Sequence, residues 1–268
     1  MRAIGWIAVN VFRESVRDKV LYNLVAFAIL LMGASYLLGQ LTAGQDVKII
    51  KDLGLAATSI FGLFIAIFIG IGLVSKEVER RSIYGLLSKP IERHQLVLGK
   101  YAGLLLTLAV NLAVMTAALY VVLGLMSWME DPFVKLGWEA SAVDPAMLKA
   151  VGLTFVELSI VTAIALFFST FSTPLLSAAF AFGLFVAGRF SADLRNFNQV
   201  VDSRAAAALA QGLYWVLPNL APFDVRSQVV HALPVPAAYL ALTAAYGVIY
   251  IAALLAASTF IFSRRDFK

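Results

Sequence analysis

The sequence predicts an all-α integral membrane protein with six transmembrane helices, and three observations support this fold class. Hydrophobic residues make up 61% of the 268 residues and charged residues only 14%, whereas soluble domains carry about 25% charged residues. Uncharged apolar runs recur that are long enough to cross a bilayer, which takes about 20 residues. Lys and Arg concentrate in alternate segments between these runs, as in multi-pass membrane proteins.

Residues 1–20 predict an interfacial amphipathic helix, set apart from a six-span transmembrane domain over residues 21–268. Apolar residues from Ile4 to Phe12 recur at helical spacing, and the charged residues fall elsewhere on the helix. Trp6 is a suitable anchor at the membrane surface. The alternative interpretation is an ordinary start to the first span.

Four uncharged runs predict one span each, and a fifth run predicts two. The four single runs are Leu21–Leu38, Leu53–Val74, Tyr101–Met129 and Ala237–Ser263. The fifth run, Val151–Gly188, carries one charge, Glu157, and is too long for one span. We therefore divide it at the sequence STFSTP, where Pro174 and the Ser/Thr cluster mark a turn.

The region 189–236, between the fifth and sixth spans, predicts an external segment that partly re-enters the membrane. Its apolar run Ala205–Phe223 is interrupted by Pro218 and Pro222. Non-helical backbone is tolerated at membrane depth only where protein or water covers it. We therefore expect a helical hairpin that dips in from the outside and caps the exit of a central pathway. A fully exposed outer domain is the alternative.

The charge distribution predicts which side of the membrane each segment faces. With six spans, the inside segments are 1–20, 75–100, 169–174 and 264–268, and they hold 13 of the 21 Lys and Arg residues. This follows the positive-inside rule. A seventh span would place the terminal SRRDFK outside, against that rule. Both termini are therefore predicted to be cytoplasmic.

Residues 75–100 hold nine of the 37 charged residues of the chain. Good helix formers from Glu77 to Leu87 predict a short amphipathic helix. Pro90 ends it, because the residue before a proline disfavours the helical region. From Ile91 a second helix can run directly into the third span. A loop that only needed solvation would not need this stiffness, although a solvated loop is the alternative.

Several motifs in the chain resemble those of type-2 ATP-binding-cassette (ABC) exporter permeases. They are Glu-x-Glu-Arg at 77–80, LLSKPI at 86–91, Arg93, Gly99-Lys100, FRESVRDK at 12–19 and LPNLAPFDVR at 217–226. The pattern is most similar to the branch that contains the copper-maturation permease of nitrous oxide reductase. One departure is Arg81-Ser82, where a small residue followed by Thr is expected.

The resemblance implies a half-transporter of the bacterial cytoplasmic membrane. Two permease copies, as a homodimer, would each dock on a separate ATPase that binds ATP and Mg. The docking element would be a coupling helix at 76–88, in which the family's positions fall on Glu77, Glu79, Arg80, Tyr84 and Leu87. In that family the first and fifth spans tend to line the subunit contact, which favours the small-residue ridge Ala179, Gly183 and Ala187. A second ridge, Gly62, Ala66 and Gly70, is also present, and either can instead pack within one subunit.

The residues themselves argue against an enzyme, in agreement with the permease subunit that the resemblance implies. The sequence contains no G-x-x-x-x-G-K-[ST] phosphate loop. Cysteine is absent, and the two histidines, His94 and His231, are predicted on opposite sides of the membrane, which argues against zinc or Ser/His chemistry. Met126 and Met129 can bind Cu(I), but packing at a span end is favoured, so no metal is predicted. The basic residues are spread between spans, so no nucleic-acid partner is expected.

Two polar residues within the spans are candidates for a translocation pathway. Glu157 lies about eight residues, roughly 12 Å, into the fourth span, where an ionisable group is a functional hypothesis by default. The alternative is a structural Glu near the outer interface. Asn111, near the middle of the third span, is expected to hydrogen-bond between helices. The alternative function is an ion-coupled secondary transporter or a channel-like membrane protein without an ATPase. One carboxylate without a second charged partner is little equipment for ion coupling. No residue pattern specifies the cargo.

Overall fold

The computed structural model describes residues 2–39, 46–79, 92–138, 141–191 and 217–264, and this part of the chain is helical without strands. The longer helices are α1 (Arg2–Ser15), α2 (Lys19–Gly39), α3 (Asp46–Glu79), α5 (Arg93–Met129), α7 (Met147–Ser169), α8 (Pro174–Arg189) and α12 (Ala237–Arg264). The short ones are α6 (Pro132–Lys135), the 3-10 helix η2 (Ala221–Phe223) and α11 (Arg226–Val230).

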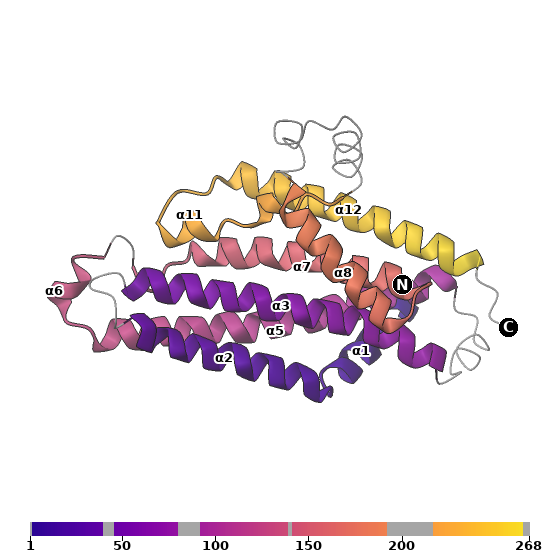
Figure 1. Ribbon diagram of the computed structural model, residues 1–268, viewed down its shortest axis with the longest axis horizontal. Helices are drawn as coiled ribbons and strands as arrows, with labels where there is room; N and C mark the ends of the chain where they lie inside the picture. Colours follow the sequence, from indigo (N-terminus) through magenta and orange to yellow (C-terminus); the bar gives the residue numbers. More distant parts are fainter. Residues whose placement is uncertain (1, 40–45, 80–91, 139–140, 192–216, 265–268) are drawn as a thin grey trace, which may run out of the picture.

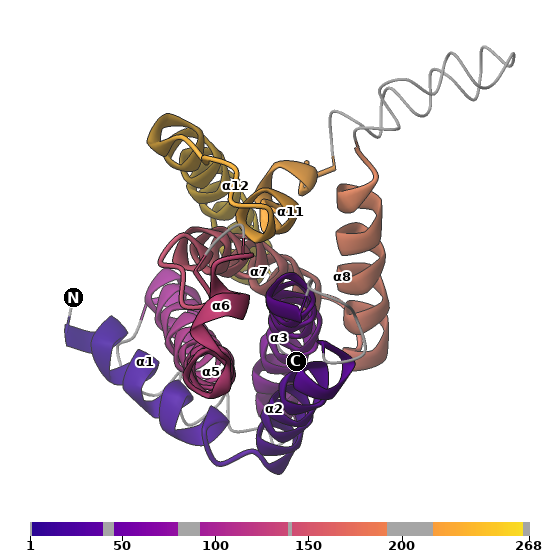
Figure 2. The same cartoon turned by 90° about the vertical axis from the view of Figure 1, so that its left-hand side faces the viewer.

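Five helices form an elongated bundle in which α3 and α7 lie at the centre (Figures 1 and 2). Each of the five is long and apolar enough to cross a membrane. The spanning stretches are Lys19–Gly39, Asp46–Ile71, His94–Met129, Met147–Ser169 and Ala237–Phe262. Over most of their length α3 and α7 are buried by their neighbours, whereas α2 and α12 expose apolar side chains around most of their surface. Such exposed apolar helices are expected where lipid replaces water as the solvent.

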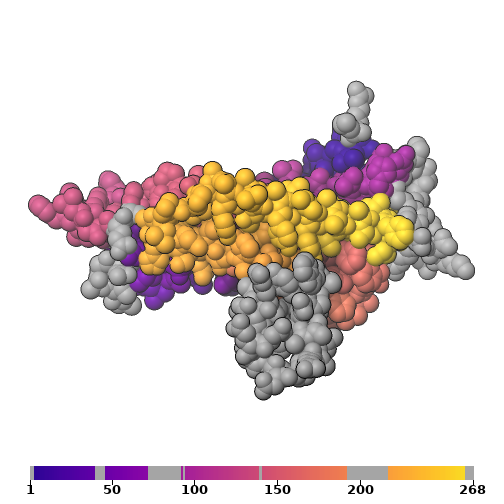
Figure 3. All heavy atoms as spheres, turned by 90° about the horizontal axis from the view of Figure 1, so that it is seen from above, coloured from indigo at the N-terminus to yellow at the C-terminus, as the bar shows by residue number. Residues whose placement is uncertain are grey.

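The bundle has two distinct ends, which we name the α1 end and the α6 end (Figure 1). At the α1 end lie α1, the starts of α2 and α5, the turn between α7 and α8, and the end of α12. The described parts of the segments that the charge rule assigns to the inside therefore share one end. Figure 3 shows α12 along one face of the molecule. The region of α6 projects at the end opposite to the α1 end.

The division of the long apolar run at STFSTP is confirmed, since α7 ends at Ser169 and α8 begins at Pro174. Proline suits the first turn of a helix because the missing N–H has no partner there in any case. The expected fifth span, however, is shorter than predicted. With 16 residues α8 is about 24 Å long, less than the roughly 30 Å of a hydrocarbon core. Among the described residues, five helices are thus long enough to span, and the sixth predicted span is a shorter apolar helix.

The second predicted span also differs at both ends. α3 begins at Asp46, before the predicted start at Leu53, and continues unbroken to Glu79. Its first turns carry Lys51, which is fully buried, and the Lys51 Nζ donates a hydrogen bond of 2.7 Å to the Ser141 carbonyl oxygen. A charge satisfied in this way lets the helix extend beyond the uncharged run that defined the prediction.

A helix is found where the N-terminal residues predict one, and it packs on the start of α5. Two glycines of α5 allow this close approach: a Cβ at Gly99 would lie 2.8 Å from the Ile7 Cβ, and one at Gly103 would lie 2.6 Å from the Ala8 carbonyl oxygen. On the same face of α1, Val11 is buried, whereas Trp6 is 76% exposed. The position of α1 at the membrane surface stays a prediction.

Candidate functional site: a buried ion-pair network

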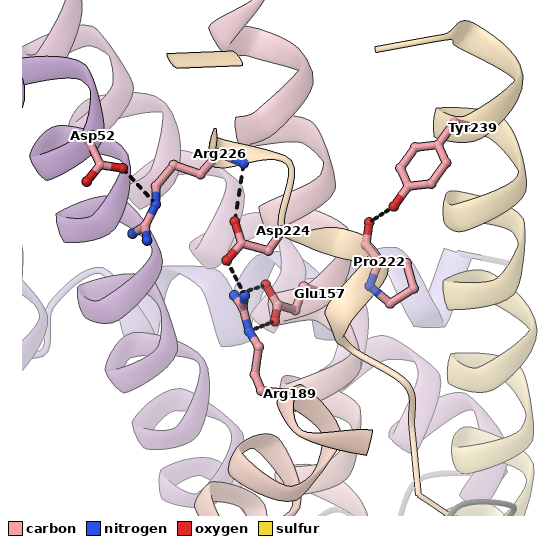
Figure 4. Close-up of polar contacts among 7 residues, drawn as sticks. All are labelled: Asp52, Glu157, Arg189, Pro222, Asp224, Arg226 and Tyr239. Carbon is pink, nitrogen blue, oxygen red and sulfur yellow. Dashed lines mark hydrogen bonds and ion pairs between the residues drawn. The ribbon is translucent and has the colours of Figure 1, made fainter. Parts of the chain in front are cut away.

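The candidate site is centred on Glu157, which lies near the middle of α7 and is fully buried. Arg189, the last residue of α8, approaches it with two nitrogens (Figure 4). The Nη2 of Arg189 donates a hydrogen bond of 2.9 Å to Oε2, and its Nε lies 2.8 Å from Oε1 in an ion-pair contact whose angle is poor for a hydrogen bond. A carboxylate and a guanidinium thus meet side by side in the interior of the spans.

The network continues from Arg189 to the segment that precedes α12. The Nη1 of Arg189 donates to Asp224 Oδ2 at 2.6 Å, and Asp224 Oδ1 accepts the backbone N–H of Arg226 at 3.2 Å. The Arg226 Nε then lies 3.0 Å from Asp52 Oδ1 on α3. Five charged side chains therefore link α7, α8, residues 224–226 and α3 (Figure 4).

The segment that carries Asp224 is held in the bundle by close backbone packing. The Leu220 N–H donates to the Gly188 carbonyl oxygen at 3.0 Å, and both Leu220 and Phe223 are fully buried. Gly188 has no space for a side chain, because a Cβ there would lie 2.7 Å from the Pro218 carbonyl oxygen. The close approach of this irregular backbone to α8 therefore depends on a glycine.

Two tyrosines of α12 hold the same segment from the other side. The Tyr239 hydroxyl donates to the Pro222 carbonyl oxygen at 2.7 Å, and the Tyr246 hydroxyl accepts the Asn219 N–H at 2.9 Å. They satisfy backbone groups that no helix or sheet pairs, which is required of non-helical backbone at membrane depth. Residues 217–230, which form part of the predicted external region 189–236, are thus packed against protein. Residues 205–216 of the expected hairpin lie outside the described residues.

Two cavities lie beside the network and share Asp224 and Arg226 in their walls. The larger, of about 650 Å³, lies toward the α6 end and is lined by residues that include Lys48, Asp52 and Gln228. The smaller, of about 260 Å³, lies next along α3 and is bounded by Arg189 and by mostly apolar side chains of α3, α7 and α8, with Ser59 and Thr154 among them. Arg189 and Arg226 therefore face open space on one side and carboxylates on the other.

The finding for Glu157 corrects one expectation from the sequence. The sequence predicts that Glu157 has no second charged partner within the spans. This prediction is wrong, because Arg189 and Asp224 both belong to the network around Glu157. The sequence assigns Arg189 to the external region 189–236, because it directly follows the uncharged part of the run Val151–Gly188. A lone carboxylate deep in a span is a signal that a cation must reach it, and Arg189 is the nearest cation along that run.

The other candidates are placed as follows. The Asn111 Nδ2 donates to the Thr107 carbonyl oxygen of its own helix at 2.7 Å, so this bond lies within α5 and not between helices.

Glu77 and Glu79 lie in the last turn of α3, whereas Arg80, Tyr84 and Leu87 lie outside the described residues. The structure therefore leaves the predicted coupling helix at 76–88 untested.

The two small-residue ridges have different surroundings. Gly62 and Gly70 of α3 contact α7: a Cβ at Gly62 would lie 2.5 Å from Leu158 Cδ1, and one at Gly70 would lie 2.6 Å from the Ala165 Cβ. This ridge packs within the chain. On α8, Ala179 and Gly183 are exposed and Ala187 is partly exposed, and no atom lies within 4 Å of a Cβ at Gly183.

The described residues contain no group of three or more His, Asp or Glu side chains arranged to hold a metal ion. Met126 is 2% exposed and packs in the core, whereas Met129 is 67% exposed at the end of α5. The two sulfur-bearing side chains thus differ in surroundings, and the absence of a metal at them stays a prediction.

The five long apolar helices indicate a multi-pass membrane protein. A family model described as ABC-2 family transporter protein matches residues 5–267, and the chain belongs to this family. The match reaches the family alone and does not support the narrower nitrous oxide reductase branch. No curated protein matches the chain.

Proposed function

We propose that the chain is the permease subunit of an ABC exporter in the bacterial cytoplasmic membrane, with both termini cytoplasmic. It works as a homodimer that moves its cargo with the energy of ATP hydrolysis in two copies of a separate ATPase, which bind ATP and Mg. Family membership over residues 5–267 supports the permease role, and the sequence contains no phosphate loop of its own. The α1 end is the cytoplasmic end.

The single observation that carries this proposal is the family match over residues 5–267, and the contact of α8 with the Glu157–Arg189–Asp224 network suggests how movement would be transmitted. α8 starts at the turn next to the α1 end, and the side chain of its last residue, Arg189, reaches the buried Glu157. Its other face presents the open ridge around Gly183. A movement of the cytoplasmic end can therefore change the position of α8, the ion pairs that hold it and the proposed subunit contact together.

Cargo would pass along the side of α3 that faces α8, where the smaller cavity exposes Arg189. In this proposal Glu157 has no direct contact with the cargo. It keeps the Arg189 guanidinium at the cavity wall, because an unpaired arginine at that depth would be costly. Asn111, whose side chain bonds within α5, has a weaker claim to the pathway.

The ATPase partnership is tested at the predicted coupling helix. Tyr84→Ala with Leu87→Ala removes two anchors, and truncating a central anchor commonly costs at least about 2 kcal/mol, roughly 30-fold in affinity. We expect the double variant to lose ATPase co-purification and transport together at normal expression. Arg80→Ala, at the rim, should change mainly the association rate and its salt dependence. A double variant that still binds the ATPase and transports normally would overturn the coupling role.

An ion-coupled secondary transporter is the second candidate, and the network itself favours it. Glu157, Arg189 and Asp224 supply the charged groups that such a mechanism needs. The two candidates differ in their energy source. In proteoliposomes with the ATPase, transport driven by ATP in the absence of ion gradients supports the exporter, whereas transport driven by a proton or sodium gradient without ATP supports the alternative.

A further inference from the structure

The two cavities beside the network form a continuous series along α3. The larger one contacts the first turns of α3, at Lys48, Ile49, Asp52 and Leu53. The smaller one contacts the next turns, at Leu55, Ala56, Ser59 and Ile60. From Lys48 to Ile60 this is about 18 Å along the helix axis. Because both cavities are also lined by Asp224 and Arg226, one molecule can occupy both.

The two cavities differ in their linings. The larger cavity is lined mostly by polar or charged side chains, among them Lys48, Ser227 and Gln228. The smaller one has a mixed lining, with apolar side chains such as Ile60 and Phe185 on α3 and α8 beside the charged Arg189, Asp224 and Arg226. The apolar part of this lining adjoins the uncharged run that starts at Leu53. A molecule that occupies both cavities therefore meets polar groups in the larger one and an apolar wall in the smaller one.

Arg226 lies where the two cavities meet, and its guanidinium is only partly paired. Among the described residues it has one ion-pair contact, from Nε to Asp52 Oδ1, and its side chain is 38% exposed. The two terminal nitrogens point away from that contact in Figure 4. A planar guanidinium with open donors suits the oxygen atoms of a phosphate, which it can bind through two parallel hydrogen bonds.

The carboxylates nearby do not remove this capacity. Asp224 is occupied on both oxygens, by Arg189 Nη1 and by the Arg226 backbone N–H. Asp52 is 49% exposed and holds Arg226 at the rim. An incoming anion therefore competes with Asp52 for the same guanidinium. A volume of about 650 Å³ is within the usual range of small-molecule sites.

We propose that the two cavities form one binding site for an amphiphile with an anionic phosphate head, which Arg226 binds while the apolar chain enters beside Ile60 and Phe185. This rests on the proposed transport function and deepens it by naming the chemical class of the cargo. The site lies at the α6 end, where an exported amphiphile would be released.

The test measures binding to the purified full chain in uncharged detergent, without any ATPase, so its result does not depend on the exporter assignment. Native mass spectrometry and titration follow three probes: phosphatidylglycerol, diacylglycerol with the same chains, and inorganic phosphate. We expect phosphatidylglycerol to bind at least tenfold more tightly than either other probe. Equal binding of diacylglycerol or of inorganic phosphate would overturn the proposal.

Two variants of the same ion pair separate recognition from folding. Arg226→Gln should weaken phosphatidylglycerol binding about 10- to 100-fold, the value of a hydrogen bond to a charged group. Asp52→Asn breaks the same pair but removes the competitor, so binding should become several-fold tighter. Lys135→Gln removes one positive charge at the same end, away from both cavities, and should have no effect. Equal losses in the Arg226 and Asp52 variants, or in Arg226 and Lys135, would overturn the assignment.

Discussion

Arg189 and Glu157 pair side by side across the α7–α8 interface, although their positions in the chain are 32 residues apart. The carboxylate is fully buried, while 23% of the arginine side chain is exposed to the adjoining cavity. The pair therefore has one partner in the core and one at a cavity wall. This ion pair holds the end of α8 against α7.

Removing one member of this pair should destabilise the protein strongly. We expect Glu157→Ala to lower the free energy of unfolding by about 1.5–3 kcal/mol, because the guanidinium loses its buried partner but keeps its pair with Asp224. Thermal unfolding of the purified protein in detergent measures this loss. The double variant Glu157→Leu with Arg189→Met should recover most of the stability, since apolar replacements of similar volume are often neutral. A double variant as unstable as the single one would contradict this account.

Gly188 should not tolerate a side chain. Gly188→Ala places a methyl group 2.7 Å from a backbone oxygen of Pro218, and overpacking of this kind costs about 1–3 kcal/mol. Gly183→Ala on the same helix is the matched control, because the new methyl group meets no atom within 4 Å. Thermal unfolding of both variants should show a loss for position 188 alone. Equal melting temperatures would mean that residues 217–220 do not pack on α8 as described.

The proposed subunit contact at α8 is testable by cross-linking, since the chain has no cysteine of its own. Gly183→Cys should form an intermolecular disulfide in membranes under mild oxidation, because two copies of the ridge would meet with their Cα atoms within about 7 Å. Gly152→Cys on α7 is the control: it is equally open within one chain but lies on another helix. Cross-linking at 152 and not at 183 would place the contact elsewhere.

The orientation of the bundle can be measured with the same cysteine-free chain. Phe133→Cys in α6, a position that is 84% exposed, should react with a membrane-impermeant thiol reagent in intact cells. Ser82→Cys, in the predicted coupling helix, should react only after the membrane is permeabilised. The opposite pattern of labelling would reverse the topology.

The features that the sequence predicts well depend on residues close together in the chain. Pro174 and the serines and threonines before it define the turn from α7 to α8. Uninterrupted apolar runs define five helices of spanning length. Pro90 predicts a helix from about Ile91 that runs into the third span, and α5 starts at Arg93 and continues to Met129. Each of these signals is read within a few turns of one helix.

The candidate site was harder to predict because its members come from four separate elements. Arg226 and Asp52 are both charges that flank apolar runs, and nothing in their local sequence indicates that they meet. The pairing depends on where α8 stops and on how residues 217–230 pack against Gly188 and Tyr246. Such contacts follow from tertiary packing, which hydropathy patterns do not report.

α5 is one continuous helix that runs from the α1 end of the bundle to α6. As one helix of 37 residues it is about 55 Å long, with α1 seated in its glycine notch near one end and α6 attached at the other. A stiff rod of that length amplifies rotation: a tilt of about 5° moves the far tip by about 5 Å relative to the near one. A force that tilts α5 where α1 packs on it would therefore move the α6 end directly. No series of contacts between other side chains is needed to carry the movement.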